Sequence, residues 1–183
     1  GGDLKVVSFN VLNFFTTLDE SGNPGSGPNN LGPRGADNQA EFDRQLEKLV
    51  TTIDAIDADI LGLIELENEF SGDQNGDGQV AIDTLVNALN DKVGAGTYAF
   101  VDPGVPFVDT GDAISVGAIY KTSSVKVAEG TTVEILTDAD LPALSINGGI
   151  NGPVFDGVST NRAPLAVTFE ELASGEKLTV AVN

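Results

Sequence analysis

Residues 60–65 read Ile-Leu-Gly-Leu-Ile-Glu, an almost continuous apolar run that ends in a carboxylate. A strand that is apolar on both faces must be covered on both faces, as strands are in the sheets of α/β proteins. The run follows a segment of helical periodicity, which in turn follows an apolar strand at residues 4–9. Strand, helix and strand in this order predict a βαβ-like unit and an α/β fold class.

The helix between the two strands is expected to begin at Asp37 or Asn38, because Asn38 and Glu41 resemble a capping box. Its apolar residues recur at helical spacing and form one face: Phe42, Leu46, Leu49, Val50, Ile53 and Ile56. A second amphipathic helix is predicted over residues 80–93. The helical pattern ends there, and the rest of the chain is predicted to be rich in strands.

Further strands are predicted at residues 98–101, 113–120, 125–127, 165–169 and 178–182. Residues 16–37 and 138–160 are rich in Gly, Pro and Asn, which predicts two long surface loops. The first loop is either a tolerated insertion or a loop on the substrate side of the fold. No internal repeat is present, so the whole chain is expected to form one α/β unit.

The charge of the chain is strongly negative, with 9 basic and 28 acidic residues and a net charge of −19. A domain that binds nucleic acid by charge alone would be basic. The acidic surface therefore serves solubility alone, or cations bridge its contacts with phosphates. The chain contains no Cys, Met, Trp or His, so Asp, Glu and Asn are the available metal ligands. Oxygen ligands favour Mg²⁺, Mn²⁺ or Ca²⁺. The apolar runs are too short to cross a membrane.

Two polar residues stand at the ends of the predicted central strands. Asn10 follows the first strand, where it either faces a site or only ties down the following turn. Glu65 ends the second strand, where a carboxylate is costly to bury without a partner. A metal ion would supply that partner, with Asn10 as the orienting amide and Glu67 as a further ligand if the strand alternates regularly. The alternative is a strand end that reaches solvent.

Arg162 is notable because basic residues are scarce. It lies between a predicted loop and a strand, where a guanidinium group suits bidentate contact with phosphate oxygens. A structural ion pair with one of the many carboxylates is the alternative.

Residues 73–78 match the first half of a calcium-binding loop, with oxygen ligands at Asp73, Asn75 and Asp77 followed by a glycine. The usual glutamate at the twelfth position is absent, and Asp83 stands one place early as the residue that would close the site. We therefore expect a structural Ca²⁺ site here, with a solvated acidic turn as the alternative.

Taken together, residues 9–13, 58–65, 113–120 and 161–165 resemble the endonuclease/exonuclease/phosphatase superfamily, whose fold is DNase I-like. Residues 34–38, 65–68 and 94–98 are similar to those of bacterial extracellular nucleases within it. The resemblance implies a DNase I-like four-layer α/β sandwich, of which residues 1–183 would be the N-terminal portion. It implies Mg²⁺ or Mn²⁺ held by Glu65 with Asn10, phosphate contact by Arg162, and hydrolysis of DNA or RNA by an activated water.

The resemblance also implies elements that this chain lacks: a His after the strand at residues 178–182, an Asp-x-Asn motif and a late Asp-His pair. We therefore expect a secreted bacterial nuclease portion that is inactive alone, pairs with the remaining half of its domain, or self-associates through an exposed sheet. Tyr120 has no assigned role. Phospholipids or small phosphate esters are alternative substrates of the same fold. A non-catalytic, calcium-stabilised interaction module is the alternative from another functional class.

Overall fold

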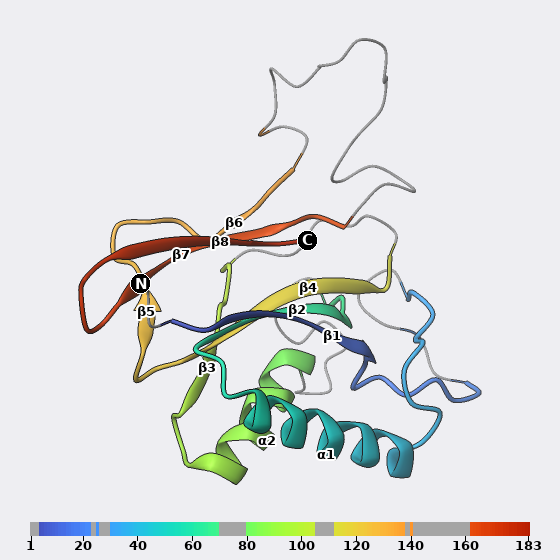
Figure 1. Cartoon of the computed structure of the whole chain (residues 1–183). Helices are drawn as coiled ribbons and strands as arrows, with labels where there is room; N and C mark the ends of the chain where they lie inside the picture. Colours follow the sequence, from blue (N-terminus) through green and yellow to red (C-terminus); the bar gives the residue numbers. More distant parts are fainter. Residues whose placement is uncertain are drawn as a thin grey trace.

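The computed structural model describes residues 4–22, 25, 30–69, 80–104, 112–137, 140 and 162–183. These residues form three layers, which Figure 1 shows from the side. Helices α1 (Gln39–Ile56) and α2 (Ala81–Val93) cover one face of a four-stranded sheet, and a second sheet packs on the opposite face. The predicted mixed α/β fold with two packed sheets is thus confirmed. A second helical layer, expected for a four-layer sandwich, has no counterpart among the described residues.

The first sheet has the strand order β1-β2-β4-β3. Its strands are β1 (Val6–Phe14), β2 (Ile60–Glu67), β3 (Tyr98–Phe100) and β4 (Ile114–Lys121). Strands β1 and β2 run parallel, with α1 between them in the chain, as the predicted βαβ-like unit requires. Strand β4 is antiparallel to both of its neighbours. The carboxyl ends of β1 and β2 therefore lie at the same edge as the start of β4.

The second sheet is built around β7. Its strands are β5 (Val125–Val127), β6 (Glu134–Ile135), β7 (Leu165–Glu171) and β8 (Lys177–Val182). Strands β5, β6 and β8 all pair with β7 in antiparallel fashion. Strand β6 was not predicted, because two residues are too few to show an alternating pattern.

The first sheet separates two hydrophobic cores. Leu61 and Leu63 of β2 belong to the core beneath the helices, whereas Ile60 belongs to the core between the sheets. Both faces of β2 are therefore covered, as its continuous apolar run predicts. Gly62 faces the second sheet at close range, since a Cβ atom there would lie 2.9 Å from Cγ2 of Val182. The absence of a side chain at Gly62 allows β8 to pack against β2.

The ends of α1 explain its boundaries. Asn38 accepts a hydrogen bond from the Glu41 backbone N–H at 3.1 Å, and the Glu41 carboxylate accepts one from the Asp37 N–H at 3.2 Å. This arrangement closely matches the predicted capping box. The helix ends at Asp57, which adopts a left-handed conformation with φ of 53°. A hydrogen bond and ion pair with Lys121 lower the pKa of the Asp57 carboxyl.

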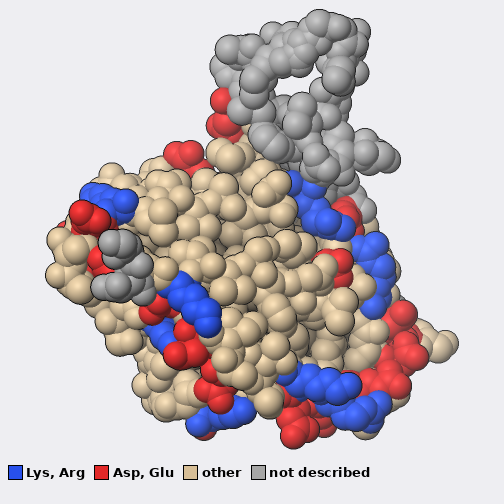
Figure 2. Space-filling model, in the orientation of Figure 1, with Lys and Arg blue, Asp and Glu red and all other residues tan. Residues whose placement is uncertain are grey.

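Strands β1 and β8 each leave one edge unpaired within the described part of the chain. A hollow of about 270 Å³ lies between them, lined by Val6, Val7, Ser8, Gly62 and residues 180–183. In the view of Figure 1 the middle of the molecule carries few charged side chains, and acidic and basic groups are mixed around it (Figure 2). Self-association through an exposed sheet stays a prediction.

Neither α1 nor α2 has the length and apolar character that a membrane-spanning helix needs.

Candidate functional site

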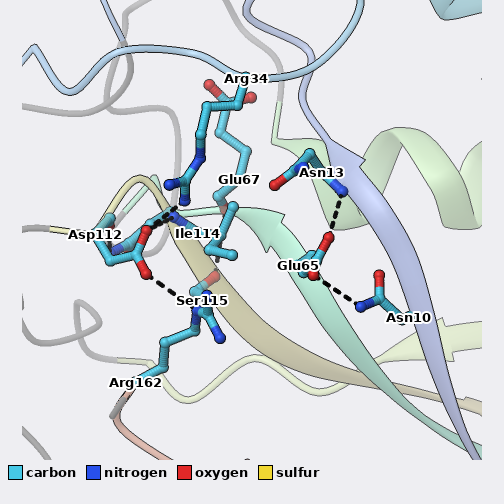
Figure 3. A network of polar contacts seen from close by, with 10 residues as sticks. Asn10, Asn13, Arg34, Glu65, Glu67, Asp112, Ile114, Ser115 and Arg162 are labelled. Atoms are coloured by element: carbon cyan, nitrogen blue, oxygen red, sulfur yellow. Dashed lines mark hydrogen bonds and ion pairs between the residues drawn. The ribbon is translucent and has the colours of Figure 1, made fainter. Parts of the chain in front are cut away.

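Asn10 lies in the middle of β1, which continues to Phe14 rather than ending before Asn10 as predicted, and it meets Glu65 where the regular pairing of β1 with β2 breaks off. Asn10 Nδ2 donates a hydrogen bond to Glu65 Oε1 at 2.8 Å, and the Asn13 backbone N–H donates to Oε2 at 3.1 Å (Figure 3). Asn10 Oδ1 also accepts a hydrogen bond from the Leu12 N–H at 2.7 Å. Asn10 therefore contacts Glu65 through its amide nitrogen and holds the backbone at Leu12 through its amide oxygen; that it faces a functional site stays a prediction.

The backbone around Glu65 is irregular. Glu65 has φ of 70°, and Leu12 and Asn13 on the facing segment have φ of 58° and 49°. The register between β2 and β4 shifts between Ile64 and Leu66, so Glu65 is the extra residue of a β-bulge. Such conformations are costly for residues other than glycine and occur frequently at functional sites.

The bulge also changes which way the following side chains point. Ile64 packs in the core between the sheets and Leu66 in the core beneath the helices, although regular alternation would place them on one face. The expectation that Glu65 and Glu67 share a face assumed this regular alternation. In the structure the Glu65 carboxylate accepts from the Asn13 N–H, and the Glu67 carboxylate accepts from the Thr16 N–H.

Glu67 is buried, with 4% of its surface exposed. Its Oε2 accepts hydrogen bonds from the Thr16 N–H at 2.8 Å, the Thr16 hydroxyl at 3.0 Å and the Thr17 N–H at 3.1 Å. Its Oε1 is shielded from solvent and has no hydrogen-bond partner among the described residues. Glu67 therefore anchors the start of the loop after β1.

Arg162 lies just before β7 and forms an ion pair with Asp112, with 3.2 Å between Nε and Oδ2. Asp112 also pairs with Arg34, whose Nη2 is 2.5 Å from Oδ1. Asp112 lies beside the end of β2, because its carbonyl oxygen accepts a hydrogen bond from Asn68 Nδ2 at 3.1 Å. The structural ion pair that the sequence left open for Arg162 is thus present, at the same edge of the sheet as Glu65.

Sequence reasoning missed Arg34 and Asp112 as members of this group. The scarcity of basic residues, which drew attention to Arg162, applies equally to Arg34. Asp112 gave no such signal, because it is one of 28 acidic residues.

Tyr120 lies away from this edge. It pairs with Ile60 at the opposite end of β2, and its ring packs edge-on against Phe169 with 5.3 Å between ring centroids. Burial raises the pKa of the Tyr120 hydroxyl. Its position makes Tyr120 part of the core between the sheets.

The predicted calcium-binding residues Asp73, Asn75 and Asp77 lie outside the described residues. Asp83 is described and lies in the first turn of α2, where Oδ2 accepts a hydrogen bond from Asn87 Nδ2 at 3.0 Å. The Ca²⁺ site stays a prediction.

The carboxylate oxygens of Glu65 are suited to bind Mg²⁺ or a similar cation that takes its remaining ligands from other groups. Each Glu65 oxygen accepts one hydrogen bond, which leaves lone pairs for a metal. Within the described residues no group of three or more His, Cys, Asp or Glu is arranged to hold a metal ion. Mg²⁺ commonly binds one or two carboxylates and completes its shell with water and phosphate oxygens. Glu65, with Asn10 beside it, suits that mode.

Neither a protein-family model nor a curated protein matches the sequence. Among solved structures, the chain is similar to a humanized D. rerio TDP2 carrying 14 mutations, with 18% identity over 97% of this chain and a TM-score of 0.48. It is also similar to an endonuclease/exonuclease/phosphatase family protein from Bacteroides thetaiotaomicron, with 12% identity over 97% of this chain and a TM-score of 0.45. A third is the human Nocturnin catalytic domain with bound sulfate, with 18% identity over 74% of this chain and a TM-score of 0.39.

The chain spans less than half the length of each of these structures, covering 45%, 48% and 40% of them respectively. One of the three is described as a member of the family that the sequence motifs resemble.

Proposed function

We propose that this chain supplies the cation-holding and phosphate-holding part of a phosphodiester hydrolase that acts on nucleic acid. The observation that carries the proposal is the placement of Glu65. Its carboxylate stands on a strained bulge, is oriented by Asn10 and the Asn13 N–H, and lies at the same edge of the sheet as Arg162. A purely structural strand end needs none of this.

Each residue has a distinct role in the proposal. Glu65 binds Mg²⁺ or Mn²⁺ directly, and Asn10 keeps the carboxylate oriented through its amide. Arg162 donates hydrogen bonds to a phosphate oxygen, for which its guanidinium geometry is well suited. A divalent cation bound at Glu65 would supply Lewis-acid polarisation of the phosphoryl group and acidify a bound water.

The proposal accommodates the negative charge of the chain. With a net charge of −19, the protein and a polyanion repel each other at long range. A cation between carboxylate and phosphate removes that repulsion where contact is made.

The chain contains no histidine, so the imidazole base that the family resemblance implies is not among its residues. A positioned general base typically contributes about 10²–10⁴-fold to the rate. We therefore propose that the chain alone hydrolyses its substrate slowly.

Calorimetric titration with Mn²⁺ tests the cation site. Glu65→Gln removes the charge and keeps the shape, and we expect it to weaken Mn²⁺ binding by more than tenfold. Glu47→Gln, on the exposed face of α1, is the matched control and should leave binding unchanged. Asp73→Ala should also leave this affinity unchanged, which separates the site from the predicted calcium loop. Equal binding by the Glu65→Gln variant would show that the site assignment is wrong.

Hydrolysis assays separate the candidate substrates. Single-stranded DNA, RNA and a phospholipid should be compared in the presence of Mn²⁺, using the chain together with its natural downstream sequence. We expect cleavage of DNA or RNA that Glu65→Gln abolishes. Phospholipid hydrolysis alone would favour the alternative substrate class. Calcium-dependent folding without any hydrolysis would favour the interaction module.

A further inference from the structure

Two of the three arginines in the chain converge on one carboxylate. Arg34 approaches Oδ1 of Asp112 and Arg162 approaches Oδ2, from segments 128 residues apart in the sequence (162 − 34). The third arginine, Arg44, lies on α1 and pairs with Glu41. One guanidinium group balances the charge of the Asp112 carboxylate. The presence of a second arginine beside it therefore requires a separate explanation.

Hydrogen bonds to β4 and to the end of β2 position Asp112, which contacts both guanidinium groups. Its Oδ1 accepts a hydrogen bond from the Ile114 N–H at 3.3 Å, and its carbonyl accepts one from Asn68. The Asn68 N–H in turn donates to the Ala113 carbonyl at 2.8 Å. These bonds tie Asp112 to the end of β2, three residues beyond Glu65. The Asp112 carboxylate therefore has a defined position at this edge of the sheet, in contact with both arginines.

Each guanidinium group keeps donors available for a further anion. The ion pairs use Nη2 of Arg34 and Nε of Arg162, so both arginines have other N–H groups without a contact among the described residues. The Arg162 Nε is itself shielded from solvent and makes no well-aligned hydrogen bond with the part of the chain that the structure describes. The two side chains are 48% and 37% exposed, so a soluble anion can reach them.

The charge balance of the group also indicates an anion. The two guanidinium groups and the one carboxylate that they contact carry a net charge of +1, while the carboxylates of Glu65 and Glu67 at the same edge accept hydrogen bonds from other groups. Holding two like charges beside each other is unfavourable, and ion pairs at this exposure recover little stability. An anion between the two arginines would relieve that repulsion.

The position of Arg34 depends on the glycine that follows it. A Cβ atom on Gly35 would lie 2.7 Å from Cβ of Phe15 and 3.1 Å from the Asn13 carbonyl oxygen. Only glycine allows the segment to lie this close to the end of β1. Gly35 thus brings Arg34 to the edge of the sheet where Glu65 stands.

We propose that Arg34 is a second phosphate-contacting residue, and that Arg34 and Arg162 form one two-arginine site that Asp112 positions. The proposal rests on the proposed function, because it identifies a further residue for the same phosphodiester. Two guanidinium groups can donate hydrogen bonds to a tetrahedral phosphate from two sides. They fix the orientation of the phosphate more completely than a single arginine does.

Arginine side-chain NMR tests this directly, because the chain has three arginines and so gives three Nε–Hε signals. Diethyl phosphate and inorganic phosphate are titrated in EDTA, without any metal. We expect the signals of Arg34 and Arg162 to shift with one common affinity while that of Arg44 stays in place. Arg34→Ala and Arg162→Ala should each weaken binding about tenfold or more, and the double variant should lose little further. Arg44→Ala should bind normally.

Three outcomes would overturn the proposal, and a fourth would overturn only the proposed function. Binding by Arg34→Ala within twofold of the unsubstituted chain would assign the phosphate to Arg162 alone and leave the proposed function intact. If the Nε–Hε signal of Arg34 does not shift on titration with phosphate, the phosphate is likewise assigned to Arg162 alone. Loss of binding in Arg34→Gln with a changed circular dichroism spectrum would mean that Arg34 is structural. If both arginines bind phosphate but Mn²⁺ binding does not require Glu65, the two-arginine site stands and the proposed function falls.

Discussion

Replacing Glu67 should separate its structural contribution from any role in metal binding. Glu67→Ala would remove the Oε2 acceptor of the Thr16 N–H and of the buried Thr17 N–H, and would leave the Thr16 hydroxyl with only its 3.5 Å contact to Glu69 Oε1. A buried donor without a partner costs about 1–3 kcal/mol, and partly exposed Thr16 can recover bonds from water. We therefore expect Glu67→Ala to lower the free energy of unfolding by about 2–5 kcal/mol, including the cavity that it leaves.

Glu67→Gln is the informative partner variant. Its carbonyl oxygen can accept the same hydrogen bonds, and its amide would occupy the place of the unpartnered Oε1. The charge assistance of the bonds is lost and the amide N–H groups find no acceptor among the described residues, whereas the cost of burying a charge is removed, which predicts a net cost of about 1 kcal/mol. Urea denaturation monitored by circular dichroism measures both values, provided that the m-values agree.

The reasoning about Glu67 would be refuted by either of two results. Equal destabilisation by Glu67→Gln and Glu67→Ala would mean that the negative charge itself is required. A Glu67→Gln variant that binds Mn²⁺ as weakly as Glu65→Gln would make Glu67 a metal ligand. We expect its Mn²⁺ affinity to stay within twofold of the unsubstituted chain.

Three further predictions concern the scaffold. Gly62→Ala should cost about 1–3 kcal/mol because its Cβ meets Val182, whereas Gly32→Ala, which meets no atom within 4 Å, should be neutral; equal urea midpoints would contradict this. Asn38→Ala should cost about 1 kcal/mol through loss of the helix cap, measured by thermal unfolding, and an unchanged Tm would count against the cap. The pKa of Asp57 is lowered from 3.8, so its contribution to stability is present above that pH and lost below it. Asp57→Asn should therefore be less stable than the unsubstituted chain at pH 6 and equally stable near pH 2, and a difference independent of pH would contradict the ion pair.

The elements that could be predicted from sequence are those whose signal is local. The cap at Asn38, the apolar face of α1 and the two-sided burial of β2 all depend on spacing within a few residues. Both helices and most of the longer strands were therefore placed within a few residues of their observed bounds, but β1 was predicted at residues 4–9 and extends to Phe14. Strand β6 has two residues and carries no pattern of its own.

The site was predictable only in part, because its geometry depends on distant contacts. The strand ends identified Asn10 and Glu65, and parallel pairing of β1 and β2 brings them together. The bulge at Glu65 depends on pairing with β4, about 50 residues away, so alternation along β2 gave the wrong relation between Glu65 and Glu67. The pairing of Arg34 with Asp112 spans 78 residues and has no local signal.

The left-handed backbone at Glu65 has a consequence for how this protein tolerates variation. Glycine relieves such a conformation, and asparagine adopts it more readily than glutamate does. Substitution by either residue would therefore recover backbone strain, of order 1–3 kcal/mol, while removing the carboxylate. A laboratory selection for thermal resistance alone should accumulate such changes at position 65, whereas a selection for activity should retain glutamate there. If glutamate is kept at position 65 under selection for activity but replaced under selection for thermal resistance, the backbone strain there is retained for function.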